Sequence, residues 1–316
     1  MGEWATARRL LLAAVLAFGC GTTDLARVEP PSLPREAETT TPSGIRIVAV
    51  RTGWVGIKEP HWRYEPPALL VLPRLVLSRR WHPWLPNISY AIARDGRSLL
   101  VDTGADPAIE SDDYMRCDPA NRFFYRHEMR FRADPEDTID RRLPELGVRA
   151  ATLETIVITH FHGDHPGRLA AFPPTRVVTG PGNWPEHVGS VPCTMPPGFA
   201  PEIATFPDGP FGVFERSQRL LDGDDVRLVP LPGHTPGHVG VLVRDGARYW
   251  LVAGDATFTE EETRSGHVCG LSQDVELAGR TQDRIRRQLD EYDTVLLPAH
   301  DPAVFRRLRT TAQEDS

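Results

Sequence analysis

Residues 160–165 read His160-Phe161-His162-Gly163-Asp164-His165 and directly follow an apolar, β-branched run, Thr155-Ile156-Val157-Ile158-Thr159. A short run of this kind is typical of a buried strand. A strand that ends in four metal-capable side chains delivers several ligands to one point at the edge of a sheet. This stretch therefore predicts a metal site at a sheet edge.

Three further residues of ligand type stand just past the ends of other apolar strands. His234 lies in the turn Pro232-Gly233-His234-Thr235-Pro236-Gly237-His238, Asp255 follows the expected strand 249–253, and His300 follows the expected strand 294–297. Alone, His300 or Asp255 would more often be a surface or capping residue. Together with the first cluster they make five imidazoles and two carboxylates, a set suited to zinc, manganese, iron or cobalt. Because seven donors exceed one tetrahedral zinc ion, we expect two adjacent divalent metal ions, with zinc as the first choice.

Composition sets broad limits on the protein. Of its 316 residues, 40% are hydrophobic and 25% are charged, which is ordinary for a globular domain that forms a core without disulfides. The formal net charge of −7 argues against a nucleic-acid partner, since phosphate binding requires a basic surface. Three cysteines follow residue 20, and in an oxidising compartment one pair can bridge and leave one free. None has the spacing of a cysteine zinc site, so we assign them no catalytic role.

The N-terminus resembles a targeting segment. Arg8-Arg9 precede the apolar run 10–18, which is too short to span a bilayer and fits a signal peptide over residues 1–20. Gly19-Cys20 resembles a bacterial lipoprotein cleavage site with Cys20 as the lipidated first residue, and a plain secretory signal is the alternative. Residues 21–43 are rich in Thr, Pro, Glu and Ser and indicate a flexible tether. The chain is thus expected to be an exported periplasmic or envelope lipoprotein that contacts the membrane only through its anchor.

Residues 44–316 form one expected domain in which strands and helices alternate. Strands are expected at 45–50, 88–93, 99–102, 155–159, 176–179, 226–229, 239–243, 249–253 and 294–297, and helices at 137–146, 280–289 and 302–309. Asp95-Gly96 and Asp245-Gly246 are favoured hairpin turns. Two strand-rich halves, each followed by helices, indicate an α/β fold with two facing sheets and outer helices. Segments 53–87 and 107–134 are expected to be irregular, with aromatics such as Trp62 and Trp84 that either line a substrate cleft or pack the loops onto the body.

Taken together, the segments 159–165 and 232–238, Gly254-Asp255 and Ala299-His300 resemble the motifs of the metallo-β-lactamase superfamily, and Leu100-Val101-Asp102-Thr103-Gly104 resembles its first motif. The resemblance spans roughly residues 45–305 and implies an αββα sandwich of two mixed sheets. It implies one metal held by His160, His162 and His234, a second held by Asp164, His165 and His300, and Asp255 bridging both. Asp102 and His238 are expected to orient ligands rather than to bind metal.

Within the superfamily, the spacing of the motifs is most similar to the N-acyl-homoserine lactonase branch. The bridging Asp255 argues against the true β-lactamases, which lack it, and His162 argues against flavodiiron-type members, which have Glu there. Glyoxalase II-type thioesterases usually carry a helical region after the last ligand, whereas only residues 301–316 follow His300. Lactonases of this branch often place a tyrosine where this chain has Phe258, and a phenyl ring donates no hydrogen bond.

The resulting hypothesis is a metal-dependent hydrolase of small-molecule lactones or related esters. A metal-bridged hydroxide is expected to attack the carbonyl, and Asp164 to pass the proton to the leaving alkoxide, with Asp255 essential to the centre. Phe258, Trp62 and Trp84 are the expected substrate-facing residues. The alternatives are a glyoxalase II-type thioesterase or β-lactam hydrolase that uses the same centre, and a non-catalytic envelope metal-binding protein.

Overall fold

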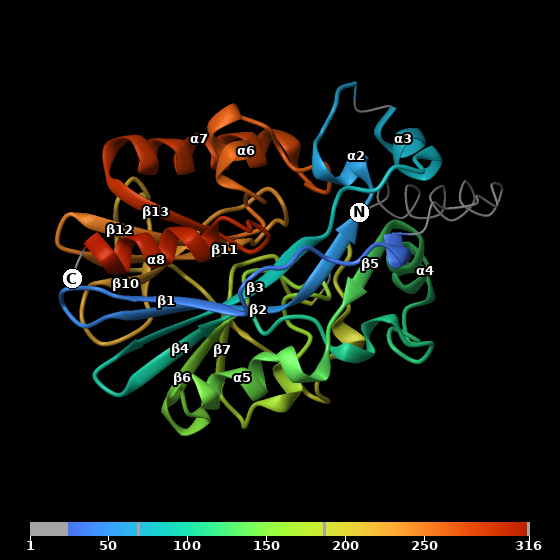
Figure 1. The fold of residues 1–316 in the computed structure, drawn as a ribbon. Coiled ribbons are helices and arrows are strands. Elements are labelled where there is room, and N and C mark those ends of the chain that lie inside the picture. Colours follow the sequence, from blue (N-terminus) through green and yellow to red (C-terminus); the bar gives the residue numbers. More distant parts are fainter. Residues whose placement is uncertain (1–24, 68–69, 186–187, 315–316) are drawn as a thin grey trace.

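Two β-sheets pack face to face in the computed structural model, which describes residues 25–67, 70–185 and 188–314 (Figure 1). The first sheet has the strand order β1-β2-β3-β4-β6-β7-β8, with β5 paired to β2. Its strands are β1 (Glu36–Thr40), β2 (Arg46–Ile57), β3 (Leu85–Arg94), β4 (Arg97–Val101), β5 (Met129–Arg132), β6 (Leu153–Val157), β7 (Arg176–Thr179) and β8 (Glu202–Ile203). The sheet is mixed, because β1 to β4 pair antiparallel whereas β4, β6, β7 and β8 pair parallel.

The second sheet has the order β13-β12-β11-β10-β9 and is also mixed, since only β12 and β13 pair parallel. Its strands are β9 (Gln218–Arg219), β10 (Val226–Pro230), β11 (Val239–Asp245), β12 (Arg248–Gly254) and β13 (Asp293–Pro298). Between the sheets lies a buried core to which the first sheet contributes Tyr90 and Leu99 and the second contributes Val241 and Trp250. Alternate residues of each strand face this core, as the two-residue period of a strand requires.

Helices cover the outer face of each sheet. On the first sheet, α5 (Ile139–Glu145) buries Ile139 and Leu143 against strand residues that point away from the central core. On the second, α7 (Val275–Glu291) buries Ile285 in the same way. The last helix, α8 (Val304–Glu314), packs beside β1 of the first sheet and contributes Val304, Phe305 and Leu308 to the core between the sheets. The expected αββα sandwich is therefore confirmed. The remaining helices are α2 (Glu59–Trp62), α3 (Val71–Leu77), α4 (Pro119–Glu128) and α6 (Glu260–Ser265), with short 3-10 turns at Leu25–Arg27, Pro107–Glu110, Pro135–Asp137, Ala150–Thr152, Leu169–Ala171 and Pro192–Thr194.

The segments expected to be irregular are partly regular. The strand expected at 45–50 continues as β2 to Ile57, and β3 begins at Leu85, so both ends of segment 53–87 belong to the first sheet. Segment 107–134 contains α4 and β5, and β5 extends the sheet along the second half of β2. Gly53 and Gly56 weaken the strand pattern of β2 in the sequence. The structure shows why glycine stands there: a Cβ on Gly53 would lie 2.7 Å from the carbonyl oxygen of Arg132.

The flexible tether expected at residues 21–43 is wrong for the residues that the structure describes. Residues 36–40 form the edge strand β1, which pairs with β2 from Glu36 opposite Val50 to Thr40 opposite Arg46. Farther upstream, Leu25 is buried in a cluster with Trp54 and Trp84. An edge strand with alternate residues exposed is polar in composition, which is why the sequence resembles a linker. The ordered domain thus begins well before residue 44.

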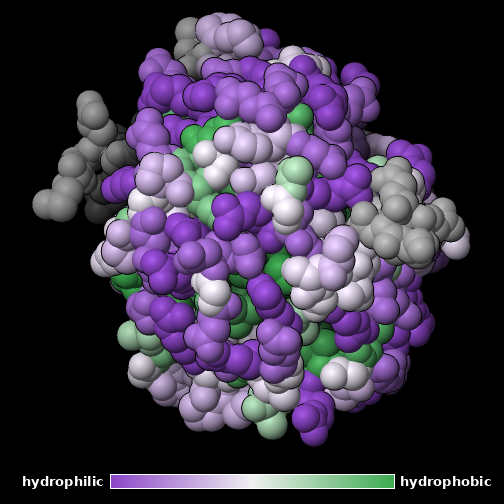
Figure 2. Space-filling model, turned by 90° about the vertical axis from the view of Figure 1, so that its left-hand side faces the viewer, coloured by the Kyte–Doolittle hydropathy of each residue, from purple (hydrophilic) through white to green (hydrophobic). Residues whose placement is uncertain are grey.

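Residues 1–24 lie outside the described part of the chain, and with them the expected signal peptide and Cys20. Among the described residues, no helix has both the length and the apolar character needed to cross a membrane. The side of the molecule at the left of Figure 1 is mostly hydrophilic, with only small hydrophobic patches (Figure 2). Cys117 and Cys193 form a disulfide, and Cys269 is a buried free thiol, so one pair bridges and one cysteine stays free as expected.

Candidate metal centre

Four strand ends meet at one edge of the sandwich and bring all seven candidate ligands together. The segment after β6 carries His160, His162, Asp164 and His165, the turn between β10 and β11 carries His234, and Asp255 and His300 follow β12 and β13. The donor atoms fall into two groups, each within 4.8 Å: His160, His162, His234 and Asp255, and Asp164, His165 and His300. Apart from His162, these side chains are at most 4% exposed.

The first group is built around His162. Its Nδ1 atom lies 2.9 Å from Nε2 of His160 and 3.1 Å from Nε2 of His234. The Oδ2 atom of Asp255 lies 3.8 Å from Nε2 of His160 and 3.6 Å from Nε2 of His234. Three ring nitrogens and one carboxylate oxygen therefore converge on one point, as the ligands of a borderline divalent cation do.

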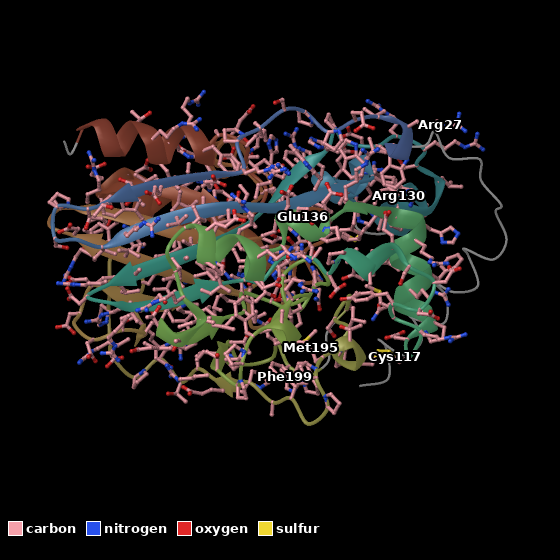
Figure 3. The ribbon with its side chains drawn as sticks, turned by 60° about the horizontal axis from the view of Figure 1, so that its bottom comes forward. Arg27, Cys117, Arg130, Glu136, Met195 and Phe199 are labelled. Atoms are coloured by element: carbon pink, nitrogen blue, oxygen red, sulfur yellow. A yellow bond between two sulfur atoms is a disulfide. The ribbon has the colours of Figure 1, made fainter. Side chains whose placement is uncertain are left out.

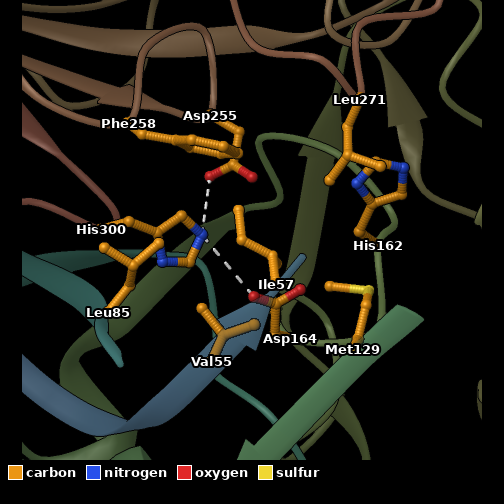
Figure 4. Close-up of a pocket in the computed structure, with 10 residues that line it drawn as sticks. All are labelled: Val55, Ile57, Leu85, Met129, His162, Asp164, Asp255, Phe258, Leu271 and His300. Atoms are coloured by element: carbon orange, nitrogen blue, oxygen red, sulfur yellow. Dashed lines mark ion pairs between the residues drawn. The ribbon is translucent and has the colours of Figure 1, made fainter. Parts of the chain in front are cut away.

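The second group shares the other oxygen of the same carboxylate. Oδ1 of Asp255 lies 3.1 Å from Nε2 of His300 and 3.4 Å from Nε2 of His165. Asp164 completes the group, with Oδ1 3.8 Å from Nε2 of His165 and Oδ2 3.7 Å from Nε2 of His300 (Figure 4). The two oxygens of Asp255 thus face different groups of imidazoles, which is the geometry of a bridging ligand.

The second ring nitrogen of several histidines is held by a neighbouring group. His165 donates from Nδ1 to Oδ2 of Asp102 at 2.8 Å, and His300 donates from Nδ1 to the carbonyl of Pro86 at 2.9 Å. His162 donates from Nε2 to the carbonyl of Val188 at 3.1 Å. Such bonds fix the orientation of each ring, so that the opposite nitrogen is the one that faces a metal.

Asp102 and His238 both lie behind the ligands. Asp102 accepts hydrogen bonds from the backbone N–H and from the hydroxyl of Thr159, each at 2.8 Å, in addition to the bond from His165. His238 accepts from the backbone N–H of Asp255 at 3.1 Å through Nε2. Asp102 therefore orients one imidazole and the start of the ligand loop, and His238 fixes the backbone that carries the shared carboxylate.

Burial and mutual proximity shift the pKa values of the cluster in opposite directions. Burial, reinforced by the neighbouring histidines, lowers the pKa of His160 well below its usual value. Burial alone would lower the pKa of His165, but Asp255 and Asp102 beside it raise that pKa well above the usual value. Burial alone would raise the pKa of Asp255, but His300 and His165 hold that pKa well below the usual value. The neighbouring imidazoles therefore favour the ionised form of the buried Asp255 carboxylate.

Two buried atoms at the centre lack hydrogen bonds. Within residues 25–67, 70–185 and 188–314, neither Nε2 of His165 nor Oδ1 of Asp255 makes one, although both atoms are buried. Buried polar atoms without partners are rare in folded proteins and mark a site for a water or an ion. Since the ring nitrogens of the first group also face one another, the donor set fits divalent metal ions.

A small pocket opens onto this cluster. His162, Asp164, Asp255 and His300 line its polar side, and the remaining lining residues are apolar (Figure 4). Phe258, expected to face the substrate, is among them. Trp62 stacks against Phe258 at 5.6 Å between ring centroids and so supports the pocket from behind.

Trp84, also expected to face the substrate, does not line this pocket. Its ring packs with Leu25 and Trp54, and its Nε1–H donates to the carbonyl of Val28 at 2.7 Å. The tryptophan thus holds the N-terminal segment of the domain against β2. Neither tryptophan lines the pocket as expected: Trp62 packs behind Phe258, and Trp84 packs the N-terminal segment.

Tyr125 is a functional residue that the sequence did not single out. This buried residue of α4 accepts a hydrogen bond from the backbone N–H of Gly163 and donates one to the carbonyl of Gly189, both at 2.8 Å. Gly163 lies between the ligands His162 and Asp164, and a Cβ on Gly189 would meet the His162 ring at 2.8 Å. Tyr125 therefore ties the ligand loop to the segment that packs against His162.

The disulfide and the side-chain amide of Asn121 also tie α4 to the segment that packs against His162. Asn121 of α4 donates from Nδ2 to the carbonyl of Ser190 at 2.8 Å, and Ser190 forms a β-bridge with His162. The disulfide joins Cys117, just before α4, to Cys193, three residues beyond Ser190, and Cys117 lies at the outer side of the domain (Figure 3). In the sequence, only the aromatic residues of segment 107–134 indicate that this segment packs near the ligand loop.

Comparisons with known proteins agree with the site. A family model described as metallo-beta-lactamase superfamily matches residues 82–300, more than half of the chain. A "probable metallo-hydrolase" of Mycobacterium tuberculosis is 30% identical in an alignment of 244 residues that covers 70% of this chain and 76% of the relative. An N-acyl homoserine lactonase of a Bacillus species is 24% identical over 218 residues, covering 69% of this chain and 82% of that protein.

Solved structures show the same fold. The Bacillus thuringiensis protein AiiA, with N-decanoyl-L-homoserine bound, superposes with a TM-score of 0.61 at 18% identity, covering 86% of this chain and 94% of that one. AidC, described as a dizinc quorum-quenching lactonase, superposes with a TM-score of 0.57 at 12% identity, covering 85% and 92%.

Replacing Tyr125 by phenylalanine should weaken metal binding. The substitution keeps the ring but leaves the N–H of Gly163 and the carbonyl of Gly189 without a partner, which frees the ligand loop. Outer partners of ligands typically change metal affinity by 10–100-fold, so we expect a loss of about 10-fold in chelator competition. Tyr249→Phe is the matched control. Tyr249 lies near the beginning of β12, at the opposite end of the strand from Asp255, so its loss of a hydroxyl should leave the metal affinity unchanged. Unaltered affinity in a folded Tyr125→Phe protein would contradict the assigned role.

Proposed function

The chain belongs to the metallo-beta-lactamase superfamily, and we propose that it is a dinuclear metal-dependent hydrolase of lactones or related esters. The observation that carries this proposal is the position of Asp255, whose two oxygens face separate groups of ligand histidines at 3.1–3.8 Å. A site with one metal has no need of a carboxylate shared in this way. The similarity to N-acyl homoserine lactonases supports the ester or lactone class.

The ligand groups define where the metals would be held. His160, His162 and His234 would bind one ion, Asp164, His165 and His300 the other, and Asp255 both. Two divalent ions held by these residues would supply a nucleophile from water at neutral pH and would polarise a carbonyl oxygen. Zinc is the proposed metal, because imidazole and carboxylate donors suit it.

The chain's own groups position the substrate and move the proton. The apolar wall opposite the ligands binds the hydrocarbon part of the substrate and keeps bulk water away from the carbonyl. Water adds to the carbonyl carbon, the bond between that carbon and the ester oxygen breaks, and the products are a carboxylic acid and an alcohol. Asp164, which lines the pocket, takes the proton of the attacking water and delivers it to the leaving alkoxide oxygen.

Replacing Asp255 by alanine is expected to abolish hydrolysis. The change removes the ligand that the two groups share, so kcat/KM should fall by more than about 100-fold, the upper range for groups that only support ligands. Elemental analysis should show close to two metals per chain in the wild type and fewer in the variant. Asp290→Asn, on the exposed side of α7, is the control and should keep both metals.

A panel of lactone, thioester and β-lactam substrates, run with and without chelator, identifies the ester class. Preferential, chelator-sensitive lactone or ester hydrolysis supports the proposal. Activity that survives Asp255→Ala with one metal or none would refute the mechanism, and full metal loading without turnover of any substrate would favour a non-catalytic metal-binding protein.

We also propose that the protein is exported and anchored through Cys20. The disulfide between Cys117 and Cys193 supports export, because disulfides persist in oxidising compartments. Replacing Cys20 by alanine should move the protein from the membrane fraction to the soluble fraction, whereas the control Cys269→Ala, at a buried thiol, should not. Unchanged fractionation of the Cys20 variant would refute the anchor.

A further inference from the structure

Beyond the candidate ligands, the side chains that line the pocket offer a substrate almost no hydrogen-bonding group. Its other lining residues are Val55, Ile57, Leu85, Met129, Phe258 and Leu271 (Figure 4). None of these side chains is charged or carries an N–H or O–H, and the thioether of Met129 is only a weak acceptor. The polar residues at the pocket are the two carboxylates and two imidazoles already committed to the metal centre.

The aromatic wall of the pocket is held in place. Phe258 is 2% exposed. Its ring stacks on Trp62 at 5.6 Å and meets the His300 ring edge-on at 5.4 Å between centroids. A ring packed on two sides does not swing aside to let another donor reach the substrate. The apolar character of this wall is therefore a fixed property of the site.

The geometry of ester hydrolysis determines which part of a substrate meets this wall. The reacting carbonyl has to lie at the ligand cluster, so a substituent on the adjacent carbon lies two bonds away and inside the pocket. The pocket is small, so a substituent placed there lies against its apolar wall. An amide on that carbon would be buried with its carbonyl oxygen unpaired, and a carboxylate there would be buried against the apolar wall without a hydrogen-bond donor.

We propose that the substrate is a small, neutral aliphatic lactone or ester whose carbon next to the carbonyl bears no amide or carboxylate, and that Phe258 enforces this choice. The inference rests on the proposed hydrolase function. It separates this chain from proteins that act on N-acyl homoserine lactones, because those substrates carry an amide on the carbon in question.

Two lactones of the same ring and chain length test the proposal directly. N-butanoyl-homoserine lactone and α-pentyl-γ-butyrolactone differ only by an amide in place of two methylenes. Values of kcat/KM are divided by the rate of alkaline hydrolysis of each compound, which removes the difference in intrinsic reactivity. We expect a preference of about 10- to 100-fold for the alkyl lactone, which corresponds to one unpaired buried polar group. Equal values, or a preference for the amide, would overturn the inference.

Phe258→Tyr and Phe258→Leu form a matched pair of variants. The tyrosine adds a hydroxyl that can donate to the amide carbonyl, so it should shift the ratio of the two lactones toward the amide by about 10-fold. The leucine changes size without adding a donor and should leave the ratio close to the wild-type value. A shift of the ratio by leucine as large as that by tyrosine would show that volume, not hydrogen bonding, sets the preference.

A binding measurement keeps the inference separate from the proposed activity. The cyclic ketones 2-pentylcyclopentanone and 2-(butanoylamino)cyclopentanone are not hydrolysed, and their affinities for the metal-loaded protein can be measured by calorimetry. Tighter binding of the alkyl ketone supports the inference even if neither lactone is turned over, an outcome that would refute the hydrolase proposal alone. Equal or tighter binding of the amide ketone would refute the inference while leaving hydrolysis of other esters intact.

Discussion

The carboxylate of Asp255 is the point on which the structure at the edge of the sandwich depends. One oxygen faces His160 and His234, and the other faces His165 and His300, so a single buried charge is shared by residues from both sheets. A buried carboxylate is stable only when it is paired and hydrogen-bonded. The four imidazoles around the carboxylate supply the pairing, and Oδ1, which makes no hydrogen bond among the described residues, fits a metal ion as its partner. The same arrangement holds two groups of metal ligands at a defined separation.

The ligands could be predicted from the sequence because each lies directly after a strand. The apolar, β-branched runs before His160, Asp255 and His300 identify the strands, and the ends of packed strands meet at one edge. The hairpin at Asp95-Gly96 and the outer helices α5 and α7 could also be predicted from the sequence, because turn chemistry and helical periodicity are local properties. The αββα arrangement follows from these elements.

The rest of the site depends on contacts that have no local signature. Tyr125 supports the ligand loop only because α4 packs against it, and nothing in the neighbouring residues marks this one hydroxyl. β1 is polar in composition, since an edge strand keeps alternate residues in solvent, and Trp84 faces the N-terminal segment rather than the pocket. Each of these outcomes is set by the partner that a residue meets in three dimensions. The pocket shows the same dependence: Val55 and Leu271 are distant in sequence and form one apolar wall beside the centre.

Anomalous diffraction from crystals of the metal-loaded protein tests the two-metal centre most directly. Two peaks are expected at the absorption edge of the bound metal, one next to His160, His162 and His234 and the other next to Asp164, His165 and His300. Each peak should lie within coordination distance of one oxygen of the Asp255 carboxylate. A single peak, or two peaks of which only one contacts Asp255, would contradict a centre built on a shared carboxylate.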